Sequence, residues 1–251
     1  MSIQSTNDVN GRPRAERDTV VDHSRWGLRL LIDGPDLSGK TTLAQRLKEE
    51  LEERGWKVVA AKGRINPGAT PGLLTKFNPN NHPDSALLNA AYIANALFDW
   101  FRLRDAPAGT IFITEGYVDR SIAYGLARRL SWVARLAARA SRLFPGFDLA
   151  ILVTADRPTR TMRMSLRRRP SRIDSRAIES HYRFLAAYRV LFRRHANRVA
   201  IDTSKVCVES AVEIALQQVL SCPGYRSIAL SMRATQVVSD QIFLPIEGPD
   251  G

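Results

Sequence analysis

The residues best able to do chemistry stand together in one glycine-rich segment, GPDLSGKT at positions 34–41. The segment fits the pattern G-x-x-x-x-G-K-[ST], in which backbone N–H groups of the loop point at phosphate oxygens. In that pattern Lys40 reaches the β- and γ-phosphates and the Thr41 hydroxyl coordinates Mg²⁺. The segment therefore predicts a nucleoside triphosphate site, formed by Gly34, Asp36, Ser38, Gly39, Lys40, Thr41 and Thr42.

The elements on either side of this loop are those that the pattern requires. The apolar run LRLLID at 28–33 predicts a buried strand, and residues 40–54 predict a helix with Leu43, Leu47 and Leu51 on one face. Because the N-terminus of a helix adds positive potential, a strand–loop–helix unit suits an anionic ligand. The local context therefore supports the prediction of a phosphate site.

Short apolar runs alternate with amphipathic stretches along the rest of the chain. Further strands are predicted at 57–61, 110–114, 149–153 and 199–201, and helices at 86–103, 121–143, 157–168, 175–196 and 206–220. Residues 63–83 are dense in Gly, Pro and Asn and predict a loop. This alternation predicts an α/β fold of the P-loop NTPase kind, with a parallel sheet of about five strands and helices on both faces.

Charge and composition narrow the choice of partner. The chain has a formal charge of +12, and residues 120–198 contain 19 Arg, no Lys and four acids. Such a region suits nucleic acid, an anionic membrane surface or a nucleotide. The sequence has no apolar run long enough to span a membrane, no signal segment and only two cysteines. We therefore expect a cytoplasmic protein without disulfides or a zinc cluster, with Cys207 buried in the last helix.

Missing motifs narrow the type of nucleotide-dependent protein. The sequence lacks the Asn-Lys-x-Asp motif that reads guanine and the apolar strand followed by Asp-Glu that is typical of ATPases. A chain of 251 residues also leaves little room for a mechanical output domain. We therefore interpret the chain as an ATP-dependent small-molecule kinase.

Several segments, in chain order, resemble those of thymidylate kinases. The loop has an acid at its third position, RINPGATP at 64–71 resembles Arg-Glu-Pro-Gly-Gly-Thr-Pro, and EGYVDRSIAY at 115–124 is similar to Asp-Arg-Tyr-x-x-Ser-Ser-x-Ala-Tyr. Segments at 147–149 and 200–204 resemble later parts of the family pattern. The resemblance implies the strand order 2-3-1-4-5 and transfer of the γ-phosphoryl of ATP to a nucleoside monophosphate, with Mg²⁺ bridging the phosphates.

The resemblance also implies roles for single residues. Asp36 would face the sugar hydroxyls of the acceptor, and Arg64 would hold the acceptor phosphate through parallel hydrogen bonds. Glu115, where the family has Asp, would orient a water on the Mg²⁺. Phe98 and Tyr124 would stack on a base, with packing in the core as the alternative for both.

Departures from the family pattern leave the acceptor open. Gly116 replaces the arginine of the family's Asp-Arg pair, and AYI at 91–93 replaces an Ala-Asp-Arg that helps to read thymine. Arg120 could reach back into the site in place of the missing arginine. In a shifted register, Asp119-Arg120-Ser121 resembles deoxynucleoside kinases, with Asp119 as a base for a 5′-hydroxyl. Three hypotheses therefore stay open: a nucleoside monophosphate kinase, a kinase acting on a hydroxyl of a nucleoside or specialised metabolite, and a nucleotide-binding regulator without turnover.

Arginines are concentrated around the turn at Pro170. Arg160, Arg163 and Arg167 share one helix face by their spacing, and a mobile segment of this kind closes over ATP in many small kinases. We expect a lid at 157–175, with Arg163 and Arg167 acting on the transferring phosphoryl; a solvated basic helix end is the alternative. The basic stretch at 128–142 is interpreted as a solvated helix with one packed face, with membrane-surface or nucleic-acid contact as the alternative.

The resulting organisation has three parts. Residues 1–25 are expected to form a flexible tail and 26–220 the kinase domain. Residues 221–251 are ambiguous, with 227–230 and 241–244 as short edge strands or as parts of a loosely docked tail. The expected partner is a small, nucleotide-like phosphoryl acceptor rather than nucleic acid or a membrane, and a homodimer is compatible with the sequence.

Overall fold

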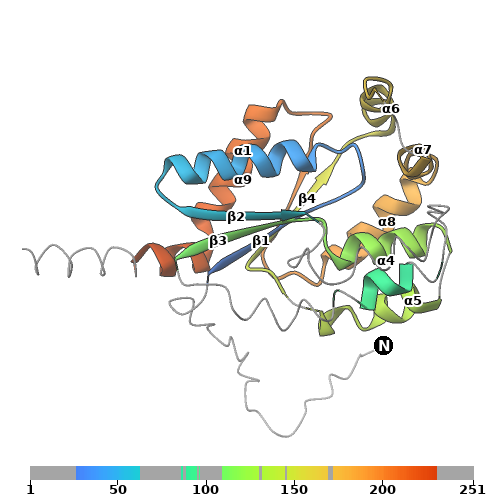
Figure 1. Cartoon of the computed structure of the whole chain (residues 1–251), viewed down its shortest axis with the longest axis horizontal. Helices are drawn as coiled ribbons and strands as arrows, with labels where there is room; N and C mark the ends of the chain where they lie inside the picture. The colour runs from blue at the N-terminus through green and yellow to red at the C-terminus, as the bar shows by residue number, and fades with distance from the viewer. Residues whose placement is uncertain are drawn as a thin grey trace, which may run out of the picture.

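The fold is built on one parallel sheet of five strands in the order β2-β3-β1-β4-β5 (Figure 1). The computed structural model describes residues 27–62, 89–94, 109–129, 132–144, 146–168 and 172–230, together with 86 and 96. The strands are β1 Leu28–Asp33, β2 Lys57–Lys62, β3 Thr110–Glu115, β4 Leu149–Thr154 and β5 Arg198–Asp202. The sheet and its order confirm the predicted α/β fold and the order implied by the family resemblance.

Burial across the sheet follows from the position of each strand. The central strands β1 and β4 are apolar and almost wholly buried because helices cover both of their faces. The edge strands β2 and β5 are mostly exposed or half-buried, and each has one buried residue. The loop of residues 34–39 leaves β1, so the phosphate-site residues start from the most rigid part of the sheet.

Helices cover the two faces of the sheet in separate groups (Figure 1). The first face carries α1 Lys40–Glu53 and α9 Val208–Ser221; the second carries α4 Val118–Ala127, α5 Trp132–Arg139 and α8 His181–Phe192. Two further helices, α6 Arg157–Ser165 and α7 Arg172–Glu179, project beyond the end of β4, and a 3₁₀ turn follows α5 at Ser141–Leu143.

Two apolar cores result, one on each face. The first joins strand residues to leucines of α1, such as Leu47 and Leu51, and to α9 through Ala215 and Val219. The second lies under α4 and α8, where Ile122, Phe184 and Tyr188 pack against β4. Successive side chains of a strand point to opposite faces of the sheet, so each strand contributes alternate residues to the two cores.

Several predicted helices are divided in the structure. The stretch at 121–143 is split into α4, α5 and the 3₁₀ turn, and the stretch at 175–196 is split into α7 and α8 at Ser180. The helix predicted at 86–103 is helical at 86, 89–94 and 96, and its other residues lie outside the described part. Residues 1–25 and 241–244 also lie outside it.

Three interpretations of the C-terminal part are wrong. Residues 227–230 are not an edge strand, because a helix spans 223–230, with Ile228 buried. That helix is also not loosely docked: Trp56 Nε1 donates to Tyr225 Oη at 3.0 Å, and the two rings lie 4.9 Å apart. Cys207 is exposed because it precedes the first turn of α9, whereas Cys222 is buried.

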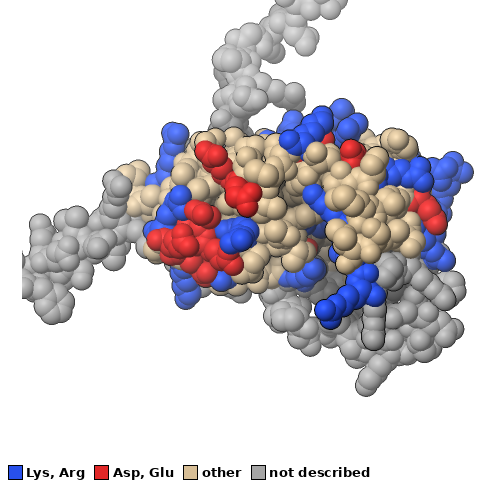
Figure 2. Space-filling view, turned by 90° about the horizontal axis from the view of Figure 1, so that it is seen from above, with Lys and Arg blue, Asp and Glu red and all other residues tan. Residues whose placement is uncertain are grey.

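Charge is segregated over the surface (Figure 2). Acidic side chains gather on the side of α1 and α9, where Glu49, Glu50, Glu53, Glu209 and Glu213 line a groove. Basic side chains gather around α6 and α7, in the arginine-rich part of the sequence. Within the described part of the chain, no helix is long and apolar enough to cross a membrane.

Candidate active site

The loop between β1 and α1 is shaped by its close approach to β4. Gly34 has a φ of 146°, and a Cβ at this position would collide with the carbonyl group of Val153. Only glycine combines this conformation with this clearance. The loop therefore passes directly over the end of β4, and its backbone is free to turn toward a ligand.

Lys40 lies folded against its own loop. Its Nζ donates to the Pro35 carbonyl at 2.7 Å and lies 3.8 Å from Asp36 Oδ1. Burial lowers the pKa of Lys40, and the neighbouring Asp36 carboxylate opposes that effect. A phosphate entering the loop would offer this buried ammonium the strong anionic partner that the two present contacts supply only in part.

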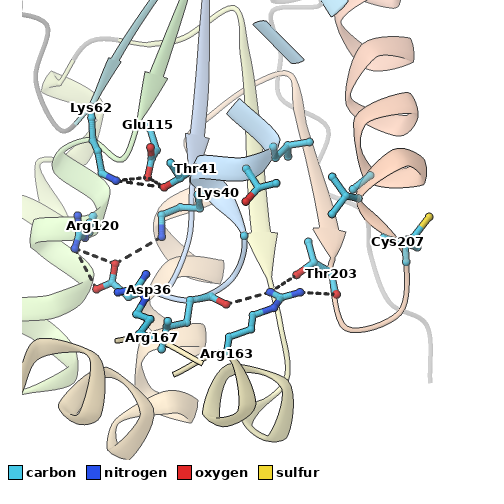
Figure 3. A pocket seen from close by; sticks show the side chains of 17 residues that line it. Asp36, Lys40, Thr41, Lys62, Glu115, Arg120, Arg163, Arg167, Thr203 and Cys207 are labelled. Atoms are coloured by element: carbon cyan, nitrogen blue, oxygen red, sulfur yellow. Dashed lines mark hydrogen bonds and ion pairs between the residues drawn. The ribbon is translucent and has the colours of Figure 1, made fainter. Parts of the chain in front are cut away.

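A cavity of about 550 Å³ opens beside the loop (Figure 3). Its walls come from the loop and α1, from the ends of β2 and β3, from α4 and α6, and from the segment after β5. Of the predicted site residues, it brings together Asp36, Gly39, Lys40, Thr41, Thr42, Glu115, Arg120, Arg163 and Arg167. Gly34 and Ser38 lie in the loop but outside the lining, with Ser38 fully buried.

Oxygen ligands suited to Mg²⁺ meet on the floor of the cavity. Thr41 Oγ1 donates to Glu115 Oε1 at 2.7 Å, and the Glu115 side chain is almost buried. Hard oxygen donors fit Mg²⁺, which takes most of its other ligands from phosphates and water. The described residues contain no group of three or more His, Cys, Asp and Glu that could hold a metal by themselves. Thr41 and Glu115 fit a Mg²⁺ that arrives with a nucleotide.

Lys62 is a cavity residue that sequence reasoning missed. Its Nζ lies 3.2 Å from Thr41 Oγ1 and 3.3 Å from Glu115 Oε1 (Figure 3). Lys62 and Glu115 are paired across β2 and β3, so both side chains leave the sheet at the same edge. The signal was available in the sequence, because a basic residue directly after the second predicted strand must lie at the carboxyl edge of a parallel sheet.

Asp36 and Arg120 form an ion pair at the side of the cavity. Arg120 Nη2 donates to the two carboxylate oxygens of Asp36 at 2.9 and 3.1 Å. Burial would raise the pKa of Asp36, but the charges of Arg120 and Lys40 outweigh it and hold the pKa below its ordinary value. Among the described residues, Nη1 and Nε of Arg120 have no hydrogen-bond partner, so the guanidinium keeps donors for a ligand.

Gly116 lies beside this arginine in a conformation that favours glycine. It has a φ of 69°, and a Cβ there would lie 3.6 Å from Cδ of Arg120. A Cβ at this distance would be in ordinary van der Waals contact with Arg120, but the positive φ would strain any side chain at position 116. The glycine that stands in place of the family's arginine therefore lies directly beside Arg120, four residues later.

Arg163 on α6 and Arg167 in the turn after it both line the cavity. Arg163 Nη1 donates to the Leu37 carbonyl at 3.0 Å and to Thr203 Oγ1 at 2.9 Å, and Nη2 donates to the Thr203 carbonyl at 3.0 Å. These bonds fasten α6 to the loop and to the end of β5. Arg167 is exposed and lines the same cavity.

Arg160 lies behind the loop rather than in the cavity. It is fully buried, and its Nε donates to the Asp36 carbonyl at 2.8 Å. Its Nη1 lies 2.7 Å from His181 Nδ1, which must accept the bond because a guanidinium only donates. Burial and the charge of Arg160 lower the pKa of His181, in keeping with a neutral ring. Arg160 therefore ties the loop to α8.

A buried carboxylate ends β1 directly before the loop. Asp33 accepts hydrogen bonds from the backbone of Gly34 and Tyr117 and from Tyr188 Oη at 2.7, 3.2 and 3.1 Å. Burial, together with the charge of Asp119, raises the pKa of Asp33 to about 6. Sequence reasoning did not single it out, although it fixes the start of the loop relative to the start of α4.

The structure does not bring every predicted site residue to the cavity. Asp119 is buried in contacts with Arg194, at 2.9 Å, and with His195 Nε2, at 2.9 Å, so it is not placed to receive a proton from an acceptor in the cavity. Tyr124 packs edge-on against Phe184 at a centroid distance of 5.3 Å and belongs to the second core. Arg64 and Phe98 lie outside the described residues.

Comparison with known proteins identifies the family. A family model described as thymidylate kinase matches residues 32–214. The chain belongs to the thymidylate kinase family. A thymidylate kinase of Exiguobacterium is 28% identical over 199 residues, covering 74% of this chain and 92% of the relative. A thymidylate kinase of Leifsonia xyli is 31% identical over 209 residues, covering 77% of this chain and 95% of the relative.

The fold agrees with a solved member of that family. The thymidylate kinase of Candida albicans superposes with a TM-score of 0.60 at 16% identity, covering 80% of this chain and 94% of the other. The family resemblance drawn from the loop and the later segments is thus confirmed. As a member of the thymidylate kinase family, the chain is an ATP-dependent nucleotide kinase that uses Mg²⁺ and transfers a phosphoryl group to a nucleoside monophosphate.

Proposed function

We propose that the cavity binds ATP over the loop and that Arg120 holds the phosphate of the nucleoside monophosphate acceptor. The observation that carries the proposal is the Asp36–Arg120 pair beside Lys40 in the lining of the cavity. A guanidinium matches phosphate oxygens in a planar, two-bond geometry. Arg120 would thereby supply from α4 the charge that Gly116 cannot supply.

The chemistry needs positioning and positive charge more than covalent participation. In phosphoryl transfer, charge spreads over the equatorial oxygens while the attacking and leaving oxygens stand roughly in line. Lys40 would bind the β- and γ-phosphates of the donor, and Asp36 would orient Arg120 and face the acceptor sugar. When bound, Mg²⁺ neutralises phosphate charge, and Thr41 and Glu115 are the residues that would hold it.

The lid is assigned to residues 157–175, with different tasks for its arginines. Because Arg163 is bonded to the Leu37 carbonyl and to Thr203, we assign it to fastening α6 over the donor site. Arg167 then becomes the lid residue that would reach the transferring phosphoryl. A guanidinium delivered there acts in a site from which the lid has excluded water, where its charge has most effect.

The rival hydroxyl kinase would need a base at the acceptor. Asp119 was the candidate, and its burial between Arg194 and His195 counts against that role. Among the described cavity residues, Asp36 and Glu115 are the carboxylates, and they face Arg120 and Thr41. A monophosphate acceptor, whose phosphate oxygen attacks without a strong base, therefore fits the site better.

Location and assembly complete the proposal. We place the kinase in the cytoplasm, with a small nucleotide as its acceptor and neither nucleic acid nor a membrane as its partner. A homodimer is part of the proposal: Trp132, Leu136 and Leu143 are exposed on and after α5, and a second copy could cover them. Light scattering on the purified protein measures whether the chain is a dimer.

The test is an ADP-release assay coupled to a visible reaction, run over a panel of nucleoside monophosphates, nucleosides and unrelated alcohols. Turnover with monophosphates, deoxythymidylate being the first to try, and none with the matching nucleosides is the expected result. Turnover only with nucleosides or other alcohols would overturn the monophosphate proposal. ATP binding without turnover on any acceptor would favour the regulatory alternative.

A further inference from the structure

The ammonium of Lys62 stands where the cavity offers its oxygen ligands. Thr41 Oγ1, Glu115 Oε1 and Lys62 Nζ form a closed triangle with separations of 2.7, 3.2 and 3.3 Å. The Lys62 side chain is 65% exposed while that of Glu115 is 10% exposed. The largely exposed Lys62 side chain, on an edge strand, thus places its positive charge beside the almost buried carboxylate of Glu115.

The hydrogen-bond roles show which part of Thr41 the ammonium uses. Thr41 gives its single hydroxyl proton to Glu115, so Lys62 must contact an oxygen lone pair of the same hydroxyl. A divalent cation at Thr41 would also bind this hydroxyl oxygen. Two cations held by one oxygen beside Glu115 would repel each other, so the ammonium and the metal compete for this position.

We propose that Lys62 acts as a built-in cation that fills the metal position in the metal-free kinase and is displaced when the nucleotide brings its metal. The proposal rests on the assignment of Thr41 and Glu115 to Mg²⁺ in the proposed function. Lys62 is then a positioning residue. It balances the charge of Glu115 before loading, and it adds positive charge beside the phosphates when no metal is present.

The structure gives Lys62 the freedom that this exchange requires. It is the last residue of edge strand β2, and its side chain, with a flexible four-carbon stem, is mostly exposed. Glu115 keeps its bond from Thr41 when Lys62 leaves, so the carboxylate does not lose its orientation. Displacement costs little because an ion pair with one exposed partner is weak.

Removing the Lys62 charge has two consequences for nucleotide binding, and both can be measured in one experiment. Without the Lys62 charge, nucleotide binding in the absence of metal should weaken, and the gain in affinity from the metal should grow. The ratio of the dissociation constant in EDTA to that in saturating Mg²⁺ reports both. We expect Lys62→Met to raise this ratio by about two- to fivefold, the range for an ion pair that is partly exposed.

The experiment is calorimetric titration of the full chain with β,γ-methylene-ATP, in EDTA and in Mg²⁺. Lys57→Met is the matched control, since Lys57 is an exposed lysine at the opposite end of the same strand. Lys62→Arg keeps the charge and should hold the ratio near the wild-type value. Thermal unfolding of each variant checks that the fold is intact.

A ratio for Lys62→Met equal to or below the wild-type value would overturn the proposal, as would an equal change in Lys57→Met. Because only a donor analogue is used, this result does not depend on which acceptor the kinase phosphorylates. Failure of the monophosphate assay with a raised Lys62→Met ratio would leave the built-in cation standing. A Lys62→Met ratio that does not rise, together with normal turnover on monophosphates, would overturn only the proposal for Lys62.

Discussion

Replacing Arg120 by Met removes the guanidinium that pairs with Asp36 while keeping the apolar part of the side chain over Gly116. The proposal predicts a selective loss of acceptor binding. A hydrogen-bonded contact between a charged group and its partner contributes about 1.5–3 kcal/mol. Arg120 is 38% exposed, so solvent screening favours the lower part of that range. The expected effect is a rise of roughly 10- to 30-fold in KM for the acceptor.

The same substitution changes Asp36. Without Arg120, the carboxylate keeps Lys40 at 3.8 Å and the charge of Arg160, but it loses the largest charge that lowers its pKa. The pKa of Asp36 should therefore rise toward its ordinary value. The donor site retains Lys40, Thr41 and the loop backbone. The dissociation constant of an ATP analogue should therefore change by less than about threefold, which is within the effect of a partly exposed pair.

The assay measures initial rates with the coupled ADP-release reaction over a range of acceptor concentrations at saturating ATP. Arg189→Met is the matched control, because Arg189 is exposed on α8 and lies outside the cavity lining. An unchanged acceptor KM in Arg120→Met, with kcat or ATP affinity reduced in its place, would refute the assignment of Arg120 to the acceptor phosphate.

Three further predictions concern the loop, the lid and the buried carboxylate before the loop. Lys40→Ala should lower kcat by about 10²–10³-fold without unfolding the chain, as expected for a lost electrostatic donor, and retained activity by the coupled assay would contradict the loop assignment. Arg163→Ala removes the bonds to Leu37 and Thr203 and should weaken ATP binding by about tenfold in calorimetry, with acceptor KM nearly unchanged; equal loss for both ligands would point to general loosening. For Asp33, the pKa of about 6 lies above the ordinary value of 3.8, so the folded state binds the extra proton and loses stability as pH rises through this interval. Urea unfolding should show wild type losing up to about 3 kcal/mol relative to Asp33→Asn between pH 4 and pH 7, and a constant difference would contradict the raised pKa.

The sequence alone was sufficient for the features that local patterns control. The loop motif depends on glycines, Lys40 and Thr41 within one short segment, so its ligand class can be read without any knowledge of packing. Each of the five strands predicted for the parallel sheet also appears, within a residue or so of its predicted ends, because a buried parallel strand needs a continuous apolar run. The alternation of strands and helices then restricts the topology, since parallel strands require crossover connections.

Only the tertiary structure decided which charged side chains face the cavity. Asp119 and Arg120 are adjacent in sequence, yet one is buried against Arg194 and His195 while the other reaches Asp36. On a helix, adjacent residues point in directions about 100° apart, so a shift of one position separates a structural ion pair from a ligand contact. No motif carries that information, because it depends on where α8 packs against α4.

The packing of distant segments also decides the contacts of Lys62, Arg163 and Cys207. Lys62 meets Thr41 and Glu115 because three segments end at one edge of the sheet, and Arg163 is fastened to Thr203 because β5 ends beside the loop. Cys207 lines the cavity because α9 begins after it rather than before it. The sequence determined that a triphosphate would bind at the end of the first strand. The packing of distant segments decided which cations and carboxylates would meet it there.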